Sequence, residues 1–331
     1  MSDNPTILGI GEALVEFTRI TDDTPNLKTD KNTPETETTR PIYRQGFGGD
    51  TSNAIIAAAR QGASTGYLSA VGGDPFGEEL LELWKRENVS VAYVKVNPTD
   101  PTGVYFVQPH ASGRSFSYAR RGSAASLYSN KELPQQAIRD AQALHASALS
   151  TAISISMREA VADAFSIAKS SDTLVSFDTN LRLNMWDIDT AVSTIEALLP
   201  KVDVVFPSDE EARQISGRTE DNDLIDYFLE FGCQMVALTR GEKGAVIATA
   251  EDRFEVAPAK CVAVDSTAAG DSFAGSFLAY YLETGDRRVA AECAAVTAAI
   301  TVSALGAIDA IPDRKVVSER LDSYRKNEGS S

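Results

Sequence analysis

The chain of 331 residues is predicted to fold as an α/β protein, a three-layer sandwich with a mostly parallel central sheet. Short apolar segments typical of buried strands alternate with segments of helical period along most of the chain, most regularly over residues 143–207. This alternation favours parallel strands covered by helices on both faces. Residues 91–96, 103–108 and 115–120 instead alternate apolar and polar side chains, which predicts an inserted small antiparallel sheet, a candidate lid.

The chain begins with a predicted buried strand at residues 6–11 and extended chain at 12–20. The fragment GIGEAL resembles the opening of a dinucleotide fingerprint, but Leu14 stands where that fingerprint needs Gly. A nicotinamide-dependent oxidoreductase also needs an acid at the end of the second strand, and Asp74 lies only beyond that end. Residues 21–41 are almost entirely polar, which predicts a surface insertion with little structure.

A glycine-rich turn precedes a predicted helix in residues 43–62, YRQGFGGDTSNAIIAAARQG, and a further Gly ends that helix. Gly48 and Gly49 would allow a ligand to approach the backbone, and Asp50 and Asn53 would face it from the start of the helix. The alternative explanation for these glycines is tight packing between the helix and a strand.

The remaining elements follow in alternation. Further strands are predicted at 65–71, 143–149, 174–178, 202–207, 235–239 and 245–248, and helices at 76–88, 157–170, 189–199, 224–231 and 289–303. Polar clusters follow the strands at 178–182, 207–211 and 239–244. Because the carboxyl ends of parallel strands meet at one edge of a sheet, we expect these clusters to lie together with residues 264–277.

Residues 264–277, VDSTAAGDSFAGSF, are the strongest single indication of a site. Ala268, Ala269 and Gly270 have almost no side chain, so their amide groups could converge on an anion at the start of the following helix. Asp271 would lie in the first turn, where a carboxylate beside bound phosphate could take a proton from a hydroxyl. The alternative is that Asp271 is only a helix cap and Gly270 only a turn residue.

Composition and charge argue against several classes of function. A net charge of −16 argues against a nucleic-acid partner, and no apolar stretch is long enough to span a bilayer. The first residues lack the pattern of a signal peptide. Cys233, Cys261 and Cys293 are odd in number and lack metal-ligand spacing, so we expect reduced thiols in a cytoplasmic protein.

Two segments resemble the signatures of the ribokinase-like (PfkB) sugar kinases: GFGGDTSNAIIAAARQG and DSTAAGDSFAGSF. The resemblance extends over residues 7–312, and GGDTSN, TGVYF, YARRGSAA and FDTNLRLNMW are similar to 2-keto-3-deoxygluconate kinases in particular. It implies one ribokinase-like domain over residues 1–331, with a small lid from inserted segments at about 13–47 and 91–121. It also implies transfer of phosphate from ATP with Mg²⁺ to a sugar acid, converting 2-keto-3-deoxygluconate to 2-keto-3-deoxy-6-phosphogluconate.

The same resemblance assigns roles residue by residue. Asp271 corresponds to the general base, and Ala268, Ala269 and Gly270 to the anion hole. The residues implied for the sugar, besides Asp271, are Gly48, Gly49, Asp50, Asn53, Tyr105, Tyr118, Arg120 and Arg182. Those implied for the nucleotide are Asn180, Arg182, Ser208, Thr239, Arg240, Gly241, Lys243, Gly244, Ala269 and Gly270. Glu211 would hold magnesium through water, and a monovalent cation near Gly306 and Ala307 is left open.

The assignment of Arg120 and Arg182 to the sugar has a physical basis, because a guanidinium group binds a carboxylate through two hydrogen bonds and a neutral sugar has no carboxylate. The alternatives are that Arg120 is a charge on the lid surface and that Arg182 forms a structural ion pair with Asp178 or Asp187. The family's Asn-x-x-Glu motif is replaced by SDEE at residues 208–211, which keeps the acid and loses the Asn.

Besides the oxidoreductase considered above, two alternative functions and one partner remain at this stage. A fructokinase or another neutral-sugar kinase would share both signatures. A sugar-acid-binding protein without activity would keep the fold but would not need Asp271 beside its amide turn. The apolar face and free edge of the lid favour a homo-oligomer.

Overall fold

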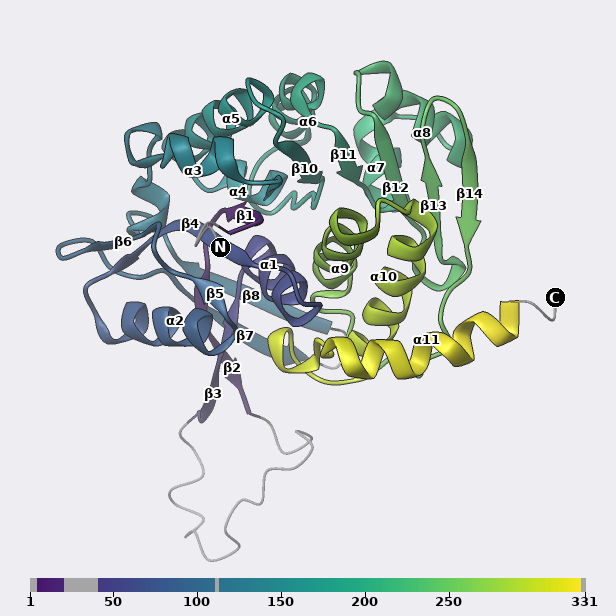
Figure 1. Cartoon of the computed structure of the whole chain (residues 1–331). Helices are drawn as coiled ribbons and strands as arrows, with labels where there is room; N and C mark the ends of the chain where they lie inside the picture. The colour runs from purple at the N-terminus through teal and green to yellow at the C-terminus, as the bar shows by residue number, and fades with distance from the viewer. Residues whose placement is uncertain (1–4, 21–40, 111–112, 329–331) are drawn as a thin grey trace, which may run out of the picture.

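The computed structural model describes residues 5–20, 41–110 and 113–328 (Figure 1). Its strands are β1 Ile7–Ile10, β2 Leu14–Arg19, β3 Tyr43–Gly48, β4 Thr65–Gly72, β5 Val89–Ser90, β6 Val94–Asn97, β7 Val104–His110, β8 Gly113–Ala119, β9 Ala143–Ser147, β10 Leu174–Asp178, β11 Val204–Phe206, β12 Met235–Thr239, β13 Ala245–Ala248 and β14 Arg253–Val256. Its helices are α1 Asp50–Arg60, α2 Pro75–Arg86, α3 Gln135–Asp140, α4 Ala148–Ala152, α5 Ile155–Lys169, α6 Ile188–Leu198, α7 Asp209–Ser216, α8 Asp221–Glu230, α9 Ala269–Thr284, α10 Arg287–Thr301 and α11 Arg314–Glu328. Short 3₁₀ turns lie at Ala125–Leu127, Asn130–Glu132, Leu199–Lys201, Gly241–Lys243 and Ile308–Ala310.

The central sheet has the strand order β14-β13-β12-β11-β10-β9-β1-β4-β5, with β6 also paired to β4. The pairs from β12 to β5 are parallel, and only β13 and β14 run antiparallel to their neighbours. The mostly parallel sheet predicted from the alternation of strands and helices is therefore confirmed.

Apolar side chains alternate between two cores, one on each face of the sheet. In β1, Leu8 and Ile10 enter the core formed with α3, α5, α6, α7 and α8, whereas Ile7 enters the core formed with α1, α2, α9, α10 and α11. Successive side chains of a strand point to opposite faces, so a strand buried on both sides must be apolar throughout. This arrangement gives the three layers expected from the sequence.

A second, smaller sheet of order β3-β2-β7-β8 lies at the lower left of Figure 1 and contains most of the segments expected to form a lid, so it is called the lid below. Its outer pairs are antiparallel, as predicted, while the central pair β2 and β7 is parallel. Residues 91–96 were expected in this sheet, and that prediction is wrong: β6 pairs parallel with β4, with Val94 opposite Ser69. Val94 is buried against the central core, so the period-two pattern there marks an edge strand of the main sheet.

The other differences concern one strand boundary and several short elements. The strand predicted at 143–149 ends at Ser147, whose side chain caps α4. The helices α3, α4, α7 and α11 and the strands β5 and β14 were not predicted. The insertion predicted at residues 21–41 lies almost wholly outside the described residues. Among the residues described, no helix combines the length and apolar character needed to cross a lipid bilayer.

Helices α1 and α9 cross in close contact, side by side in Figure 1. A Cβ atom on Gly275 of α9 would lie 1.9 Å from the carbonyl oxygen of Ala54 in α1. Only glycine allows this approach of two backbones. The crossing brings the first turns of both helices, which carry Asn53 and Asp271, to the same place.

Candidate active site

A cavity of about 830 Å³ lies at the carboxyl ends of the central strands, between the lid and the start of α9. Its walls include nearly every site residue expected from the sequence: Gly48, Gly49, Asp50, Asn53, Tyr105, Tyr118, Arg120, Asn180, Arg182, Ser208, Glu211, Thr239, Arg240, Gly241, Lys243, Ala268, Ala269, Gly270 and Asp271. Gly244 is the one expected residue that does not line it. A Cβ atom on Gly244 would lie 2.1 Å from the Val256 carbonyl oxygen, so this glycine serves the packing of β13 on β14.

The two glycines before α1 pack against protein atoms. A Cβ atom on Gly48 would lie 2.3 Å from the Tyr105 hydroxyl, and one on Gly49 would lie 2.5 Å from the Glu12 carbonyl oxygen. Gly49 also has a φ of 128°, which side chains rarely adopt. Both glycines therefore pack closely against the Tyr105 side chain or the loop after β1, which is not the packing of a helix on a strand, and both also line the cavity.

Two amide side chains orient two carboxylates in the cavity. Asn53 Nδ2 donates to Asp271 Oδ2 at 2.8 Å, and Asn180 Nδ2 donates to Asp50 Oδ2 at 2.8 Å. Asn180 has a φ of 20°, and its backbone N–H donates to Asp178 Oδ1 at 3.0 Å. The loop after β10 and the start of α1 are thus locked together around the acids.

Burial and neighbouring acids raise the pKa of two carboxyl groups in the cavity, those of Asp271 and Asp178. Burial, followed by the negative charge of Asp50, raises the pKa of Asp271 from 3.8 to about 7, while Asn53 and Arg182 act in the opposite direction. Burial also raises the pKa of Asp178 well above its usual value, with Glu211, Asp271 and Asp50 adding to the effect. A carboxyl group with a pKa near 7 is suited to accept a proton at neutral pH.

The turn before Asp271 forms the start of helix α9. Ala268 adopts the left-handed conformation, with φ 61° and ψ 13°, and caps the helix. The Ala269 amide group donates to the Ser266 carbonyl at 3.3 Å, so this amide is partly engaged within the turn. A Cβ atom on Gly270 would meet nothing within 4 Å, and its exposed backbone borders the cavity. First-turn amides of a helix lack acceptors within the helix, which makes this end suited to an anion.

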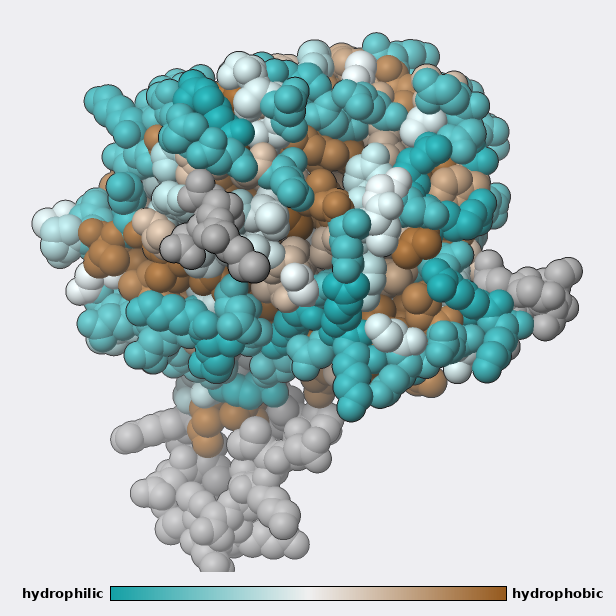
Figure 2. Space-filling view, in the orientation of Figure 1, coloured by the Kyte–Doolittle hydropathy of each residue, from teal (hydrophilic) through white to brown (hydrophobic). Residues whose placement is uncertain are grey.

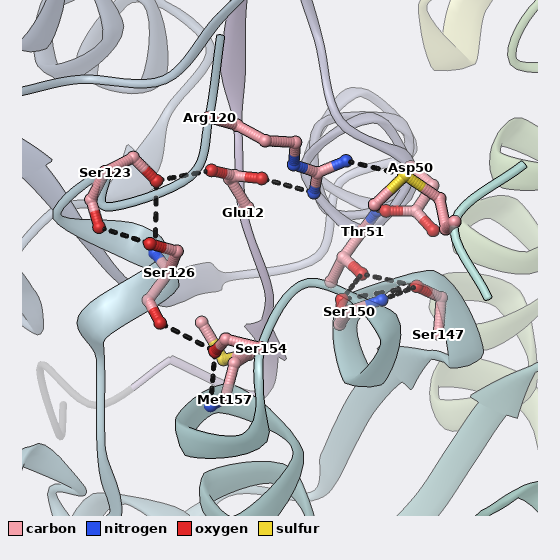
Figure 3. Close-up of polar contacts among 11 residues, drawn as sticks. Glu12, Asp50, Thr51, Arg120, Ser123, Ser126, Ser147, Ser150, Ser154 and Met157 are labelled. Carbon is pink, nitrogen blue, oxygen red and sulfur yellow. Dashed lines mark hydrogen bonds and ion pairs between the residues drawn. The ribbon is translucent and has the colours of Figure 1, made fainter. Parts of the chain in front are cut away.

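Aromatic and charged side chains of the lid close the other end of the cavity. The Tyr105 hydroxyl donates to Glu16, and the Tyr105 ring stacks on Tyr118 with centroids 5.7 Å apart. Arg120 lies over the Tyr118 ring at 5.5 Å and is only 8% exposed. Arg120 is therefore not a charge on the lid surface. It forms a buried ion pair with Glu12, shown in Figure 3.

Arg182 and Glu211 meet at the cavity rim. Arg182 Nη1 donates to the Leu181 carbonyl at 3.0 Å and lies 3.4 Å from Glu211 Oε1. Its side chain is 51% exposed, so this pairing is weak and the guanidinium stays accessible. Neither alternative partner, Asp178 or Asp187, is the one found.

Glu211 is held by the surrounding loops. It accepts hydrogen bonds from Thr179 Oγ1 at 2.8 Å, from the Leu181 amide at 3.0 Å and from the Ser208 amide at 3.3 Å. Ser208 caps α7 in return. No group of three or more His, Cys, Asp or Glu side chains in the described part of the chain is arranged to hold a metal ion.

The segment after β12 borders the cavity with its backbone. Arg240 is committed to two carboxylates, with Nη1 3.0 Å from Asp221 and Nη2 3.2 Å from Glu255. Thr239 Oγ1 donates to the Pro207 carbonyl at 3.4 Å. Gly241 has a φ of 55°. Arg240 is therefore not free to bind an anion, whereas Lys243, exposed in the same loop, also lines the cavity.

Sequence reasoning missed Glu12, which follows the buried strand β1, and considered Asp178, the last residue of β10, only as part of the polar cluster at 178–182 and as a possible ion-pair partner of Arg182. Glu12 is 3% exposed, and burial raises its pKa while the Arg120 charge and a hydrogen bond from Ser123 lower it. The rule that polar residues at strand ends collect at one edge, which already included Asp178, would also have found Glu12. Glu12 was instead considered only as part of a dinucleotide turn.

Comparison with known proteins extends these observations. The model of the pfkB family carbohydrate kinases matches residues 5–314. A 2-dehydro-3-deoxygluconokinase from Thermoproteus tenax is 32% identical, over 84% of this chain and 86% of its own length. A fructokinase from Escherichia coli is 30% identical, over 81% of this chain and 89% of its own length.

Solved structures agree with the fold. The E. coli protein described as a ribokinase II in complex with ATP and Mg²⁺ superposes with a TM-score of 0.84 at 26% identity, covering 96% of this chain and 99% of that protein. The expected ribokinase-like architecture is thereby confirmed. With the family model spanning most of the sequence, the chain belongs to the pfkB family of carbohydrate kinases.

Proposed function

We propose that this ATP-dependent sugar kinase phosphorylates a sugar acid, 2-keto-3-deoxygluconate, to 2-keto-3-deoxy-6-phosphogluconate. The observation that carries the proposal is the buried guanidinium of Arg120 in the wall of the cavity beside Tyr118. A second cation, Arg182, is accessible at the rim of the same cavity. The substrate's carboxylate gives these donors a partner that a neutral sugar does not.

Asp271 is proposed as the general base. It lies in the cavity with one carboxylate oxygen held by Asn53, which leaves the other to accept the proton of the substrate's attacking hydroxyl. The first-turn amides of α9 would hold the transferred phosphoryl group beside it, with Gly270 allowing close approach. The hydroxyl oxygen then bonds to the γ-phosphorus as the bond from that phosphorus to the bridging oxygen of ADP breaks.

The acidic cavity fits a nucleotide that arrives with a divalent cation. Asp50, Asp178, Glu211 and Asp271 share the cavity, and a bare triphosphate would be repelled by them. Mg²⁺ would supply positive charge that offsets the triphosphate, with Glu211 in reach through water. A monovalent cation near Gly306 and Ala307 is a further proposal, tested by titrating K⁺ at constant ionic strength.

A parallel assay of ATP consumption tests the substrate proposal. The enzyme is given 2-keto-3-deoxygluconate, fructose and ribose at equal concentrations, and kcat/KM is compared. We expect the sugar acid to be preferred by at least about tenfold, the worth of one good charge-assisted contact. The second candidate is a fructokinase, favoured by the E. coli relative, and a preference for fructose would establish it in place of the acid.

The lid is proposed to pair with a second copy of the chain. Ile42 is 56% exposed and Phe106 is 36% exposed, and Figure 2 shows apolar surface where β2 and β3 leave the body of the protein. Ile42 precedes the edge strand β3 and Phe106 lies on the inner strand β7, and exposed apolar side chains of this kind favour association. Phe106→Asp should lower the mass measured by analytical ultracentrifugation, whereas a monomeric wild-type protein would refute the pairing. The unpaired Cys233, Cys261 and Cys293 agree with the proposed cytoplasmic location.

A further inference from the structure

Glu12 lies just after β1, inside the wall of the cavity, and belongs to none of the roles described above. Its Oε1 accepts a hydrogen bond from Ser123 Oγ at 2.8 Å, and its Oε2 pairs with Arg120 Nη2. Figure 3 shows this carboxylate between the two partners. Ser123 is fixed in turn, because its Oγ accepts from the Ser126 amide at 3.2 Å and its carbonyl accepts from Ser126 Oγ at 2.8 Å. The carboxylate is therefore held in one position.

Glu12 also packs against the segments that enclose the sugar end of the cavity. A Cβ atom on Gly49 would lie 2.5 Å from the Glu12 carbonyl oxygen, and one on Gly103 would lie 2.9 Å from Glu12 Oε1. The first glycine precedes α1 and the second precedes β7 of the lid. Glu12 thus joins the central sheet, the glycine loop and the lid at one point.

Arg120 keeps donors that the ion pair does not use. Its Nη1 faces only the sulfur of Met185, a weak acceptor at 3.9 Å, and within the described residues its buried Nε has no hydrogen-bond partner. A buried donor without an acceptor is costly. Arg120 therefore has donors for a further acceptor, and it lines the cavity where the sugar would lie.

The cavity offers Arg120 competing acceptors. Asp50, Asp178 and Asp271 line the same space, and each would attract a guanidinium that was free to turn. Glu12 is the carboxylate that holds Arg120 at the lid end, away from these acids. Because the pair is neutral overall, Arg120 would recognise a substrate's carboxylate by oriented donors, while the accessible Arg182 would supply net positive charge.

We propose that Glu12 is a positioning residue that holds the Arg120 guanidinium toward the sugar end of the cavity and so sets the preference for acidic over neutral sugars. This inference rests on the proposed sugar-acid kinase activity. Glu12 acts through Arg120 and does not touch the reacting atoms.

The test is the substitution Glu12→Gln, which keeps the size of the side chain and an acceptor for Ser123 but removes the charge that holds Arg120. We expect KM for 2-keto-3-deoxygluconate to rise by about tenfold or more, with kcat and the KM for fructose changing by less than about threefold. A role in folding alone would lower thermal stability and leave the ratio of the two KM values unchanged. That unchanged ratio, in an enzyme whose wild-type form prefers the acid, would overturn the inference and leave the proposed function intact.

A double-mutant cycle with Arg120→Gln separates action through Arg120 from any other effect. In the Arg120→Gln background, Glu12→Gln should change the ratio of KM values by less than about twofold, because the guanidinium it would position is gone. A further change of about tenfold there would overturn the inference. This comparison also covers the case in which Glu12→Gln alone fails to fold, since the double variant contains neither buried charge. A wild-type enzyme that prefers fructose would overturn both the inference and the proposed function.

Discussion

Asp271→Asn is expected to reduce activity and to increase stability, and the second effect distinguishes this carboxylate from an ordinary helix cap. The pKa of Asp271 is raised from 3.8 to about 7, chiefly by burial and then by Asp50. A carboxyl group whose pKa is higher in the folded state than in the unfolded state destabilises the fold when it is ionised. The penalty is complete above about pH 7 and disappears as the pH falls toward 4.

The size of this penalty follows from the two pKa values. A change from 3.8 to about 7 corresponds to about 4 kcal/mol, at about 1.4 kcal/mol per pH unit. Asp271 is partly exposed at the cavity wall, so water screens some of this penalty. We therefore expect Asp271→Asn to raise the free energy of unfolding by about 1–3 kcal/mol at pH 8. The Asn side chain keeps an acceptor for Asn53, so loss of that hydrogen bond does not cancel the gain.

Urea unfolding of the wild-type protein and of Asp271→Asn at several pH values measures the gain in stability. Turnover of ATP by the two proteins measures the loss of activity. We expect kcat to fall by roughly two to four orders of magnitude, and wild-type kcat/KM to fall about tenfold per pH unit below about pH 7. Asp172→Asn, a change of an exposed residue outside the cavity, is the matched control and should alter neither quantity. A stability loss at pH 8, or a gain that does not depend on pH, would refute the electrostatic argument. A kcat within about tenfold of wild type would refute the role as base.

Three further substitutions test the other parts of the site. Arg120→Ala should raise KM for the sugar acid by about tenfold or more and that for fructose much less; Arg121→Ala, its exposed neighbour, is the control, and equal losses for both sugars would contradict the carboxylate contact. Gly270→Ala should leave the melting temperature unchanged, because a Cβ there meets nothing within 4 Å, yet raise KM for ATP by about tenfold; an unchanged KM would exclude close phosphate approach. Gly275→Ala should cost about 3 kcal/mol in thermal unfolding, because its Cβ would lie 1.9 Å from the Ala54 carbonyl oxygen, and a neutral effect would show that α1 and α9 can separate freely.

Much of the fold could be predicted because each face of the central sheet leaves its period in the sequence. The alternation of Leu8 and Ile10 with Ile7 between two cores shows why β1 is apolar throughout. The period of the sequence did not identify the correct sheet for the strand that contains Val94. One buried side chain in a polar strand is compatible with an edge of either sheet, and only the pairing with β4 decides between them.

The residues lining the cavity could be predicted from two glycine-containing turns and the ends of strands, but their partners could not. Arg120 looked like a charge on a lid or a free fork for a carboxylate, and it is a buried member of an ion pair. The partner, Glu12, is 108 residues away in the sequence, and nothing in the local pattern of either segment specifies the contact. Pairings between distant segments are decided by tertiary packing, which composition and period do not record.

The charges of the cavity indicate how an acidic protein can hold a triphosphate. Three arginines line the cavity, and each faces a carboxylate: Arg120 faces Glu12, Arg240 faces Asp221 and Glu255, and Arg182 faces Glu211. Only the last pair is loose and exposed. The arginines therefore contribute little net charge for the nucleotide, whereas the exposed Lys243 is a further cation in the cavity wall, and the amide groups at the start of α9 are the proposed fixed donors. Because those amides carry only partial charges, the affinity for ATP should depend more on a divalent cation bound with the nucleotide than on any single arginine.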